Sequence, residues 1–522
     1  MQILIVDLGS QYTTLIGRSL RDLGVRSIIQ PPARAVSWID RHSTELRGVI
    51  ISGGAASISD FEPEDLPAPI LAVARPILGI CLGMHWMARA FGGSVESIRE
   101  QRSYGAEDIE ILQADDPLLR RVTRIGNTVW MSHGDSVTKL PSGFRRTARG
   151  IHGEVAAMSS QDGMVFGVQF HPEVAETECG REIFTGFLDV VGATRDWEPA
   201  DICGRIREEV ASAVPPGERA ILAFSGGVDS SALTAIVAPV LGNRLDCVAF
   251  DHGGLRRSEE QEILVNAAAV GCGHPDAPTI SLETCQRMFL AAVARAGTDA
   301  QAKRHAFRDM YGVHLDAFAE TCRARVLIQG TLAPDVIESG ERGAASVIVT
   351  HHNVGLATGL RQLHPLSDLF KYEVRELARY LGLPPSIAER KPFPGPGLYC
   401  RVVGAPVTKE LLDAVRWADA EVRKIVAEAH IEHEFDQLVV ALLCGTTVAG
   451  VKGDGRAYAY LAAVRAVQTS DFMTCRGYRF PPRPDNPAPV WERIMRALVR
   501  HPLIVGAVSD ENDKPPRRTE FE

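Results

Sequence analysis

Short apolar runs that end in glycine recur along the first third of the chain. Residues 3–9 (ILIVDLG), 48–54 (GVIISGG) and 76–83 (PILGICLG) show no alternation of apolar and polar positions. A continuous apolar run of this length is typical of a strand that is buried on both faces of a sheet. Helical patterns separate the runs, and residues 163–170 (GMVFGVQF) predict a further strand. The pattern therefore predicts the α/β class, with helices covering a parallel sheet.

A second series of the same kind begins near residue 220. The expected strands are 220–227, 245–251, 279–282, 324–330 and 346–352. Residues 194–220 predict a linker helix and a turn, whereas the prolines and glycines of 390–398 (RKPFPGPGL) cannot continue a helix or a central strand. These signals predict three domains, at residues 1–192, 200–392 and 393–522, of which the last mixes helix and strand.

Composition narrows the class of protein. A chain of 522 residues with 45% hydrophobic residues is long enough for several packed domains. The net charge of -9 argues against nucleic acid or an anionic membrane as a partner, because both need a basic surface. The chain starts without a cationic signal region, holds no apolar run long enough to span a bilayer, and has no C-x-x-C among its ten cysteines. We therefore expect a cytoplasmic protein, where a reactive thiol stays reduced.

Residues 77–86 (ILGICLGMHW) hold one cysteine between two glycines. Cys81, flanked by Gly79 and Gly83, closes a predicted strand and opens a predicted helix, which the glycines at 92–93 end. This is the arrangement of a nucleophile elbow, in which glycines relieve the steric conflict of a sharp turn. The helix N-terminus would favour a thiolate. The alternative is a small buried residue at a strand end, since free cysteine is among the most buried residue types.

A base for this thiol stands in the segment VQFHPEV. His171 is followed two residues later by Glu173, and near a strand end residues i and i+2 point the same way. The carboxylate can then orient the imidazole, and the imidazole can face the thiol. An isolated H-P-E segment is more typical of a structural histidine beside a surface acid. Its occurrence with the cysteine turn in one α/β unit favours the catalytic interpretation.

Four segments together resemble the class I glutamine amidotransferases, which have a flavodoxin-like α/β fold: 51–54, 79–83, 131–135 and 168–173. The resemblance implies that Cys81 attacks the side-chain amide of L-glutamine, that His171 is the base with Glu173 as its orienting partner, and that ammonia is released. It also implies a set of oxyanion-stabilising and glutamine-binding residues, namely Gly53, Gly54, Leu82, Gly83, His85, Ser132, His133, Gly134 and Asp135.

Two positions depart from the usual pattern of this family. His85 stands where a glutamine usually helps to hold the substrate, and Ala55 stands where a proline usually follows the two glycines. An imidazole can still donate a hydrogen bond, but it is shorter and can become charged near pH 6.5. We expect the chemistry at Cys81 to be retained, and whether glutamine use is preserved, altered or lost stays open.

Residues 222–233 (LAFSGGVDSSAL) predict a strand, a turn of serine and glycine, and a helix start. Such a turn presents backbone N–H groups to a phosphate. The Gly-Lys-Ser/Thr ending of a Walker A loop is missing. The segment instead resembles the pyrophosphate loop of the N-type ATP pyrophosphatases (adenine nucleotide alpha hydrolase-like fold), although an ordinary helix cap is the alternative.

That resemblance implies that ATP is split into AMP, which is transferred to a substrate oxygen, and pyrophosphate. It implies an ATP-binding and pyrophosphate-binding set made of Ser225, Gly226, Gly227, Val228, Asp229, Ser230, Ser231 and Gly330. Asp229 is the expected Mg²⁺ ligand, since Mg²⁺ prefers a carboxylate together with phosphate oxygens.

Further motifs resemble, in order and over essentially the whole chain, the glutamine-hydrolysing GMP synthase family; they lie at 328–339, 350–355, 391–398, 451–460, 470–474 and 514–522. The resemblance implies glutamine-dependent amination of XMP to GMP through adenylyl-XMP. It implies that the C-terminal α+β domain pairs two copies into a homodimer and helps to build the XMP site. The implied XMP-binding residues are Arg304, Gln437, Lys514 and Glu520.

Several departures lie close to the nucleotide motifs. Residues 251–254 read DHGG where D-x-G-L is more usual, and Tyr399 stands where a small residue is usual. Three functions are therefore weighed. The first is a glutamine-dependent GMP synthase. The second is a divergent paralogue that uses free ammonia, tolerates an inhibitor or aminates a related purine nucleotide, and the third is a nucleotide-binding regulator.

Overall fold

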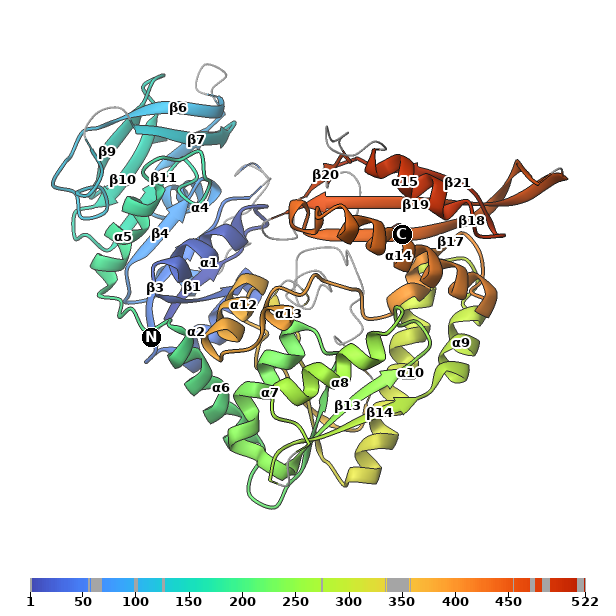
Figure 1. The fold of residues 1–522 in the computed structure, drawn as a ribbon. Coiled ribbons are helices and arrows are strands. Elements are labelled where there is room, and N and C mark those ends of the chain that lie inside the picture. Colours follow the sequence, from blue (N-terminus) through green and yellow to red (C-terminus); the bar gives the residue numbers. More distant parts are fainter. Residues whose placement is uncertain are drawn as a thin grey trace. The chain divides into compact units, whose positions relative to one another are not determined.

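The computed structural model of the chain describes residues 2–54, 57, 68–97, 102–123, 127–273, 276–333, 335, 356, 358–453, 455–469, 475–480, 489–513 and 521. They form two compact units, which the colours of Figure 1 separate along the sequence. The first unit extends to Ile202 and the second begins at Cys203.

The described elements of the first unit are β1 (Gln2–Val6), α1 (Thr13–Asp22), β2 (Arg26–Gln30), α2 (Pro32–His42), β3 (Leu46–Ile51), α3 (Ala68–Leu71), β4 (Ile77–Ile80), α4 (Leu82–Ala90), β5 (Ser94–Glu96), β6 (Ser103–Ile111), β7 (Asn127–His133), β8 (Ser136–Lys139), β9 (Phe144–Gly150), β10 (Val155–Ser160), β11 (Val165–Val168) and α5 (Gly180–Val191). Helix α6 (Pro199–Ala213) leads into the second unit.

The described strands of the first unit form a nine-stranded sheet in the order β2-β1-β3-β4-β11-β10-β9-β6-β7. The first five run parallel, and the remaining four are antiparallel to their neighbours. In the parallel part β1 lies between β2 and β3, which is the order of a flavodoxin-like sheet. A small pair, β5 with β8, lies apart from it.

Two apolar layers cover the two faces of the parallel strands. Ile3 and Ile5 pack with residues of α1 and α5, whereas Leu4 and Val6 pack with residues of α2 and α4. Successive strand residues point to opposite faces, so an unbroken apolar run suits a strand that is buried on both. Each such side chain stabilises the fold by about 1.5–3 kcal/mol on leaving water.

The described elements of the second unit are β12 (Ala220–Ala223), α7 (Val228–Leu241), η3 (Gly242–Arg244), β13 (Leu245–Asp251), α8 (Glu259–Ala269), β14 (Thr279–Thr284), α9 (Gln286–Arg295), α10 (Ala300–Cys322), β15 (Val326–Ile328), β16 (Arg361–Leu363), α12 (Lys371–Tyr380), α13 (Pro385–Ala388), η4 (Gly397–Arg401), β17 (Val402–Val403), α14 (Lys409–Glu428), η5 (Glu432–Glu434), β18 (Gln437–Lys452), β19 (Gly455–Gln468), β20 (Arg476–Tyr478), α15 (Val490–Leu498) and β21 (Ile504–Ser509).

The second unit contains two sheets. Strands β14-β13-β12-β15-β16 are all parallel, and β12 lies between β13 and β15. The other sheet has the order β17-β18-β19-β20, with β21 paired to β19, and α14 and α15 pack against it (Figure 1). One core cluster contains residues of α10 together with residues of α14 and β18. This continuous core joins the predicted ranges 200–392 and 393–522 within a single unit.

Most of the predicted strands are confirmed. The runs near residues 3, 48, 76 and 163 become β1, β3, β4 and β11, and the second series becomes β12, β13, β14 and β15. The strand predicted at 346–352 lies outside the described residues. The predicted domain boundaries stay a prediction.

Candidate functional site

Cys81 lies at a sharp turn between β4 and α4. Its backbone has φ 52° and ψ -109°, a conformation that L-residues rarely adopt. A Cβ on Gly83 would lie 2.9 Å from the carbonyl oxygen of Ser52, and one on Gly79 would lie 2.7 Å from the carbonyl carbon of Gly83. Glycine at both positions therefore lets the helix pack directly against the strand ends. The turn presents Cys81 at the helix N-terminus, as a nucleophile elbow requires.

The sheet brings His171 to this turn. Strand β11 pairs in parallel with β4, so that Val168 lies beside Ile80, and the amide of Cys81 donates to the carbonyl of Val168 at 2.8 Å. The carboxyl ends of parallel strands share one edge of a sheet. Segments that are about ninety residues apart in the sequence therefore meet at the same edge.

His171 joins Cys81 to Glu173. Its Nδ1 hydrogen-bonds to Oε1 of Glu173 at 2.8 Å, which leaves Nε2 for the sulfur of Cys81. Burial opposes a charge on this imidazole, but the bonds to Cys81 and Glu173 outweigh burial and raise the pKa of His171 to about 10. The imidazole thus holds its proton at neutral pH, next to a thiol that can lose one.

The side chain of His85 points away from solvent and toward Gln169. His85 Nε2 lies 2.7 Å from Oε1 of Gln169, and Nε2 of Gln169 lies 3.9 Å from Sγ of Cys81. Both side chains are buried, and burial lowers the pKa of His85 to about 4 against the opposing effect of the bond to Gln169. His85 is therefore neutral at pH 7. Its predicted role in holding glutamine stays a prediction.

Other residues predicted to bind glutamine or the oxyanion surround the same turn. A Cβ on Gly53 would lie 2.9 Å from the His171 ring and 3.5 Å from Cβ of Cys81, while one on Gly54 would meet Leu82. The carbonyl oxygen of Ser132 lies 3.7 Å from Sγ of Cys81. The backbone at Gly53 and at Ser132 thus lies close enough to Cys81 to contact a substrate that is bonded to its sulfur.

The segment after Ser132 continues along this edge. Nδ1 of His133 bonds to the carbonyl of Asp135 at 2.9 Å, and the carboxylate of Asp135 accepts from Ser57 at 2.5 Å. A Cβ on Gly134 would lie 3.4 Å from the Tyr104 hydroxyl. Their binding roles stay predictions.

The serine and glycine turn lies between β12 and α7. Gly226 has φ 68°, which favours glycine, and the hydroxyls of Ser225 and Ser230 lie 3.2 Å apart. The amide of Ser225 donates to the Ser230 hydroxyl, and that of Gly227 donates to the Ser225 hydroxyl. Because β12 lies between β13 and β15, the turn opens at the edge where the strand order reverses, which is where α/β sheets bind ligands.

Asp229, in the first turn of α7, forms an ion pair that the sequence pattern did not reveal. Nζ of Lys371 lies 2.6 Å from its Oδ2. Gly330 lies close by, since a Cβ there would lie 3.3 Å from Cβ of Asp229. Lys371 is the first residue of α12, and its proximity to the loop depends on packing between two helices that are remote in sequence. The hydroxyl of Ser231 is buried without a partner among the described residues.

Asp229 also fits the expected Mg²⁺. Among the described residues, no group of three or more His, Cys, Asp and Glu could hold a metal by itself. The second oxygen of Asp229, Oδ1, is buried and has no partner in the described part of the chain. Mg²⁺ commonly takes one carboxylate and completes its shell with phosphate oxygens and water. Oδ1 of Asp229, which has no partner among the described residues and lies beside the serine and glycine turn, meets that requirement.

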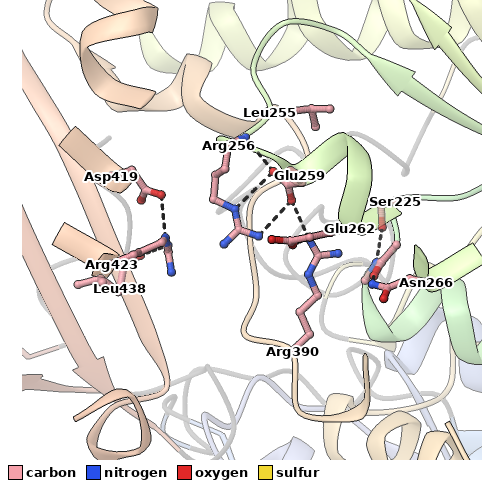
Figure 2. Close-up of polar contacts among 12 residues, drawn as sticks. Ser225, Leu255, Arg256, Glu259, Glu262, Asn266, Arg390, Asp419, Arg423 and Leu438 are labelled. Atoms are coloured by element: carbon pink, nitrogen blue, oxygen red, sulfur yellow. Dashed lines mark hydrogen bonds and ion pairs between the residues drawn. The ribbon is translucent and has the colours of Figure 1, made fainter. Parts of the chain in front are cut away.

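A network of ion pairs lies beside the serine and glycine turn at residues 225–231, which is called the phosphate loop below (Figure 2). Glu259, near the start of α8, accepts from Arg256 at 3.1 Å and from Arg390 at 2.8 Å. Farther along the same helix, Asn266 donates to the carbonyl of Gly226 at 2.8 Å. A cavity of about 640 Å³ adjoins this helix, and Arg256, Asn266 and Arg390 are among the residues that line it. The ion pairs of Glu259 hold the start of α8 in place. The bond from Asn266 to Gly226 then connects this helix to the phosphate loop.

Two of the four residues predicted to bind XMP lie among the described residues. Arg304 is buried on α10, and Gln437 is buried at the start of β18, and both elements contribute to one core cluster. Lys514 and Glu520 lie outside the described residues, as does the motif at 350–355.

The two departures near the nucleotide motifs contact each other. A Cβ on Gly254 would lie 2.7 Å from Cδ2 of Tyr399, and the Tyr399 hydroxyl donates to the carbonyl of His252 at 2.6 Å. The tyrosine ring therefore occupies the space into which a side chain at position 254 would extend. The same Cβ would lie 2.9 Å from the carbonyl oxygen of Pro396, so the ring and this carbonyl both favour glycine at position 254.

None of the helices in the described part of the chain combines the length and apolar character that a membrane span needs.

Comparison with known proteins gives a consistent picture. The family model described as "Glutamine amidotransferase class-I" matches residues 4–190, and the one described as "GMP synthase C terminal domain" matches residues 424–521. The chain is 38% identical over 539 residues to the GMP synthase [glutamine-hydrolyzing] of Thermobifida fusca, covering 100% of this chain and 98% of that protein. It is 37% identical over 527 residues to the protein of the same name from Aeropyrum pernix, with the same coverage.

A solved structure is similar to part of the chain. This protein, described as a "putative gmp synthase subunit a protein" from Thermoplasma acidophilum, is 30% identical, and the match covers 37% of this chain and 94% of the other, with a TM-score of 0.34.

Proposed function

The chain belongs to the glutamine-hydrolysing GMP synthase family, and from that premise we propose that it converts XMP, ATP and L-glutamine into GMP, glutamate, AMP and pyrophosphate. The observation that carries the proposal is the geometry of Cys81, His171 and Glu173, which provides a nucleophile with a positioned imidazole. The phosphate loop on the same chain supplies the second half of the reaction.

The first half is glutamine hydrolysis. The thiolate of Cys81 attacks the side-chain amide carbon, and the resulting oxyanion accepts hydrogen bonds from backbone N–H groups of Gly53, Gly54 and Leu82. Collapse breaks the C–N bond, and His171 donates its proton to the leaving ammonia. His171 then takes a proton from water, which attacks the thioester and releases glutamate. Glu173 keeps the imidazole oriented through both steps.

The second half activates XMP. The C2 oxygen of XMP attacks the α-phosphorus of ATP, which breaks the bond to the β-phosphate and gives adenylyl-XMP and pyrophosphate. Ammonia then attacks C2, and AMP leaves with the oxygen. Residues 225–231 hold the pyrophosphate part, with Lys371 as an added cation. When bound at Asp229, Mg²⁺ would neutralise phosphate charge.

The XMP site is proposed to include Arg304, Gln437, Lys514 and Glu520. A nucleoside monophosphate needs a cation for its phosphate, and donors and acceptors for its purine edge. These four side chains supply such groups. We also propose that the protein works in the cytoplasm, where its ten free cysteines would stay reduced.

A homodimer through the C-terminal part is also proposed. The β18–β19 hairpin exposes Val451 and Tyr458, whose exposed fractions are 79% and 62%. Exposed apolar side chains on a long hairpin are typical of a surface that pairs with a second copy. Light scattering should then give twice the chain mass of 56.7 kDa, and a mass of one chain would contradict the dimer.

A divergent paralogue and a nucleotide-binding regulator are less well supported. An ammonia-dependent paralogue or a regulator would be expected to lose part of the catalytic set, whereas the chain keeps the contact of His171 with Glu173 and the hydrogen bonds of Ser225 and Gly227. The full-length relatives also share the name GMP synthase [glutamine-hydrolyzing].

The test supplies XMP, ATP and Mg²⁺ with amide-¹⁵N-glutamine or with ¹⁵N-ammonium, and reads the product nucleotide by mass. We expect labelled GMP from both donors. Cys81→Ala should abolish labelling from glutamine by at least about 10³-fold and keep labelling from ammonium. GMP from ammonium alone in the wild type would support the ammonia-dependent paralogue, and no GMP from either donor would contradict the proposal.

A further inference from the structure

Gln169 lies between His85 and Cys81 and contacts both. It has no exposed surface, its Oε1 lies 2.7 Å from Nε2 of His85, and its Nε2 lies 3.9 Å from the sulfur. Gln169 is not one of the three residues Cys81, His171 and Glu173, so its contact with the sulfur is additional to theirs. The side chain of Gln169 therefore links the His85 ring to the sulfur, in addition to the backbone bond in which the amide of His85 donates to the carbonyl of Cys81 at 3.1 Å.

The chemistry of these atoms allows one orientation of the Gln169 carboxamide beside a thiolate. A thiolate only accepts hydrogen bonds, so the amide must turn its N–H₂ group to the sulfur and its oxygen to His85. His85 must then donate through Nε2–H, which a neutral imidazole does in one of its two tautomers. The titratable groups around the pair are His171 and Glu173 beside Cys81, and His133 and Asp135 beside His85.

We propose that His85 is a positioning residue that fixes the Gln169 amide, so that its N–H donates to the Cys81 thiolate. The inference rests on Cys81 being the nucleophile of the proposed function. In contrast to the predicted role in glutamine binding, it assigns residue 85 to the reactivity of the sulfur and leaves the hold on substrate to other groups.

The variant that tests this most directly is Gln169→Glu. A glutamate keeps the size of the side chain and still accepts from His85, but it presents an acceptor in place of the donor to the sulfur. Iodoacetamide is a small probe of the thiolate, and peptide mass mapping can follow alkylation of Cys81 among the ten cysteines. We expect the pH profile of alkylation to move to higher pH by about one unit, which is about a tenfold slower reaction at pH 7.

Two variants of His85 separate positioning from packing. His85→Gln restores a donor to Oε1 of Gln169 and should keep the wild-type alkylation profile. His85→Phe fills the ring volume without a donor, and should shift the profile in the same direction as Gln169→Glu. For glutamine hydrolysis we expect kcat to fall about tenfold or more in both Gln169→Glu and His85→Phe, with KM changed by less than about threefold.

Gln161→Glu makes the same chemical change on an exposed loop of the same unit and should leave both measurements unchanged. An unshifted profile in Gln169→Glu would overturn the proposal. So would a rise in KM alone for His85→Phe, because it would assign residue 85 to substrate binding. If the wild type hydrolyses no glutamine, the proposed function fails, but the alkylation profile still decides the contact.

Discussion

At the scale of single residues, the reactivity of Cys81 depends on two opposite environments for histidine. Burial lowers the pKa of His85 to about 4, whereas the bonds to Cys81 and Glu173 overcome burial and raise the pKa of His171 to about 10. One ring is therefore neutral and the other is charged at the same pH. The charged ring can stabilise a thiolate and deliver a proton to ammonia, which a neutral ring in its place could not do.

Glu173→Gln should shift the alkaline limit of glutamine hydrolysis. The carboxylate helps to hold the proton on His171, so its removal lowers the pKa of the imidazole from about 10 toward the ordinary value. The active protonation state is then lost at a lower pH. We expect the alkaline limb of kcat/KM to move down by at least about one unit, and kcat to fall about tenfold or more.

The matched control for this prediction is Glu176→Gln, which neutralises an exposed carboxylate three residues away. Its profile should coincide with that of the wild type. A Glu173→Gln enzyme whose alkaline limb stays in place would mean that Glu173 does not act on the charge of His171.

The proposed catalytic residues could be found in the sequence because their chemistry depends on local spacing. Glycines two residues on either side of Cys81, and the short separation of His171 from Glu173, are visible in the sequence. The partner of His85 was not predicted, because Gln169 lies 84 residues away and reaches it only through the pairing of β4 with β11. Lys371 was missed for the same reason, since its contact with Asp229 depends on the packing of two helices.

At the scale of elements, two segments of the second unit differ from the usual pattern in opposite directions, one carrying a smaller side chain and the other a larger one. The turn after β13 carries Gly254 where a leucine is more usual, and η4 carries Tyr399 where a small residue is more usual. A Cβ on Gly254 would lie 2.7 Å from the tyrosine ring. Since packed interiors tolerate volume-conserving changes best, the two departures compensate each other.

A double-mutant cycle tests this compensation. Gly254→Leu alone should destabilise the unit because its side chain meets the ring, and Tyr399→Gly alone should destabilise it through a cavity and a lost hydrogen bond to His252. In the double variant the leucine no longer meets the ring, and only the carbonyl oxygen of Pro396, 2.9 Å from its Cβ, still opposes it. We expect a favourable coupling of about 1–3 kcal/mol, measured by urea unfolding.

Strictly additive effects in this cycle would contradict the compensation. A suitable unrelated pair is Gly254→Leu with Tyr380→Gly, since Tyr380 is an exposed residue of α12, and its coupling should be close to zero.

The strands that could be predicted are those buried on both faces. Every residue of β1 and β13 is buried, so apolar runs mark them clearly. Strand β2 alternates buried and half-buried residues, and β6 mixes exposed and buried ones. Alternation over so few residues is a weak signal, and the pairing that makes β6 part of the sheet comes from tertiary structure. The antiparallel flank of the first unit was therefore missed.

At the scale of the whole molecule, each unit holds a fully buried neutral histidine. His85 belongs to the first unit and His252 to the second, and burial lowers the pKa of each to about 4, against the effects of nearby acidic groups. An unfolded histidine has a pKa near 6.5. Between pH 6.5 and about 4, the unfolded chain therefore binds protons that the folded chain does not.

This difference predicts acid sensitivity with a definite sign. The folded-state pKa is depressed, so the stability that a neutral histidine allows is complete above about pH 6.5 and falls as the pH drops toward 4. A shift of this size corresponds to about 3 kcal/mol for each site. Hydrogen exchange should show opening of the α4 segment and of the turn after β13 as the pH is lowered from 8 to 5.

The buried histidine of each unit can be replaced separately, so the acid sensitivity of the two units can be tested independently. His85→Gln removes the titrating group from the first unit. His252→Asn does so in the second, where an amide oxygen can replace Nδ1 as the acceptor for the Gly254 amide. Each variant should reduce the loss of protection at low pH in its own unit and leave the other unit as sensitive as before. His152→Gln and His433→Asn change exposed histidines and should protect neither. Equal acid sensitivity in all variants would mean that carboxylates, rather than the buried imidazoles, set the acid limit of the fold.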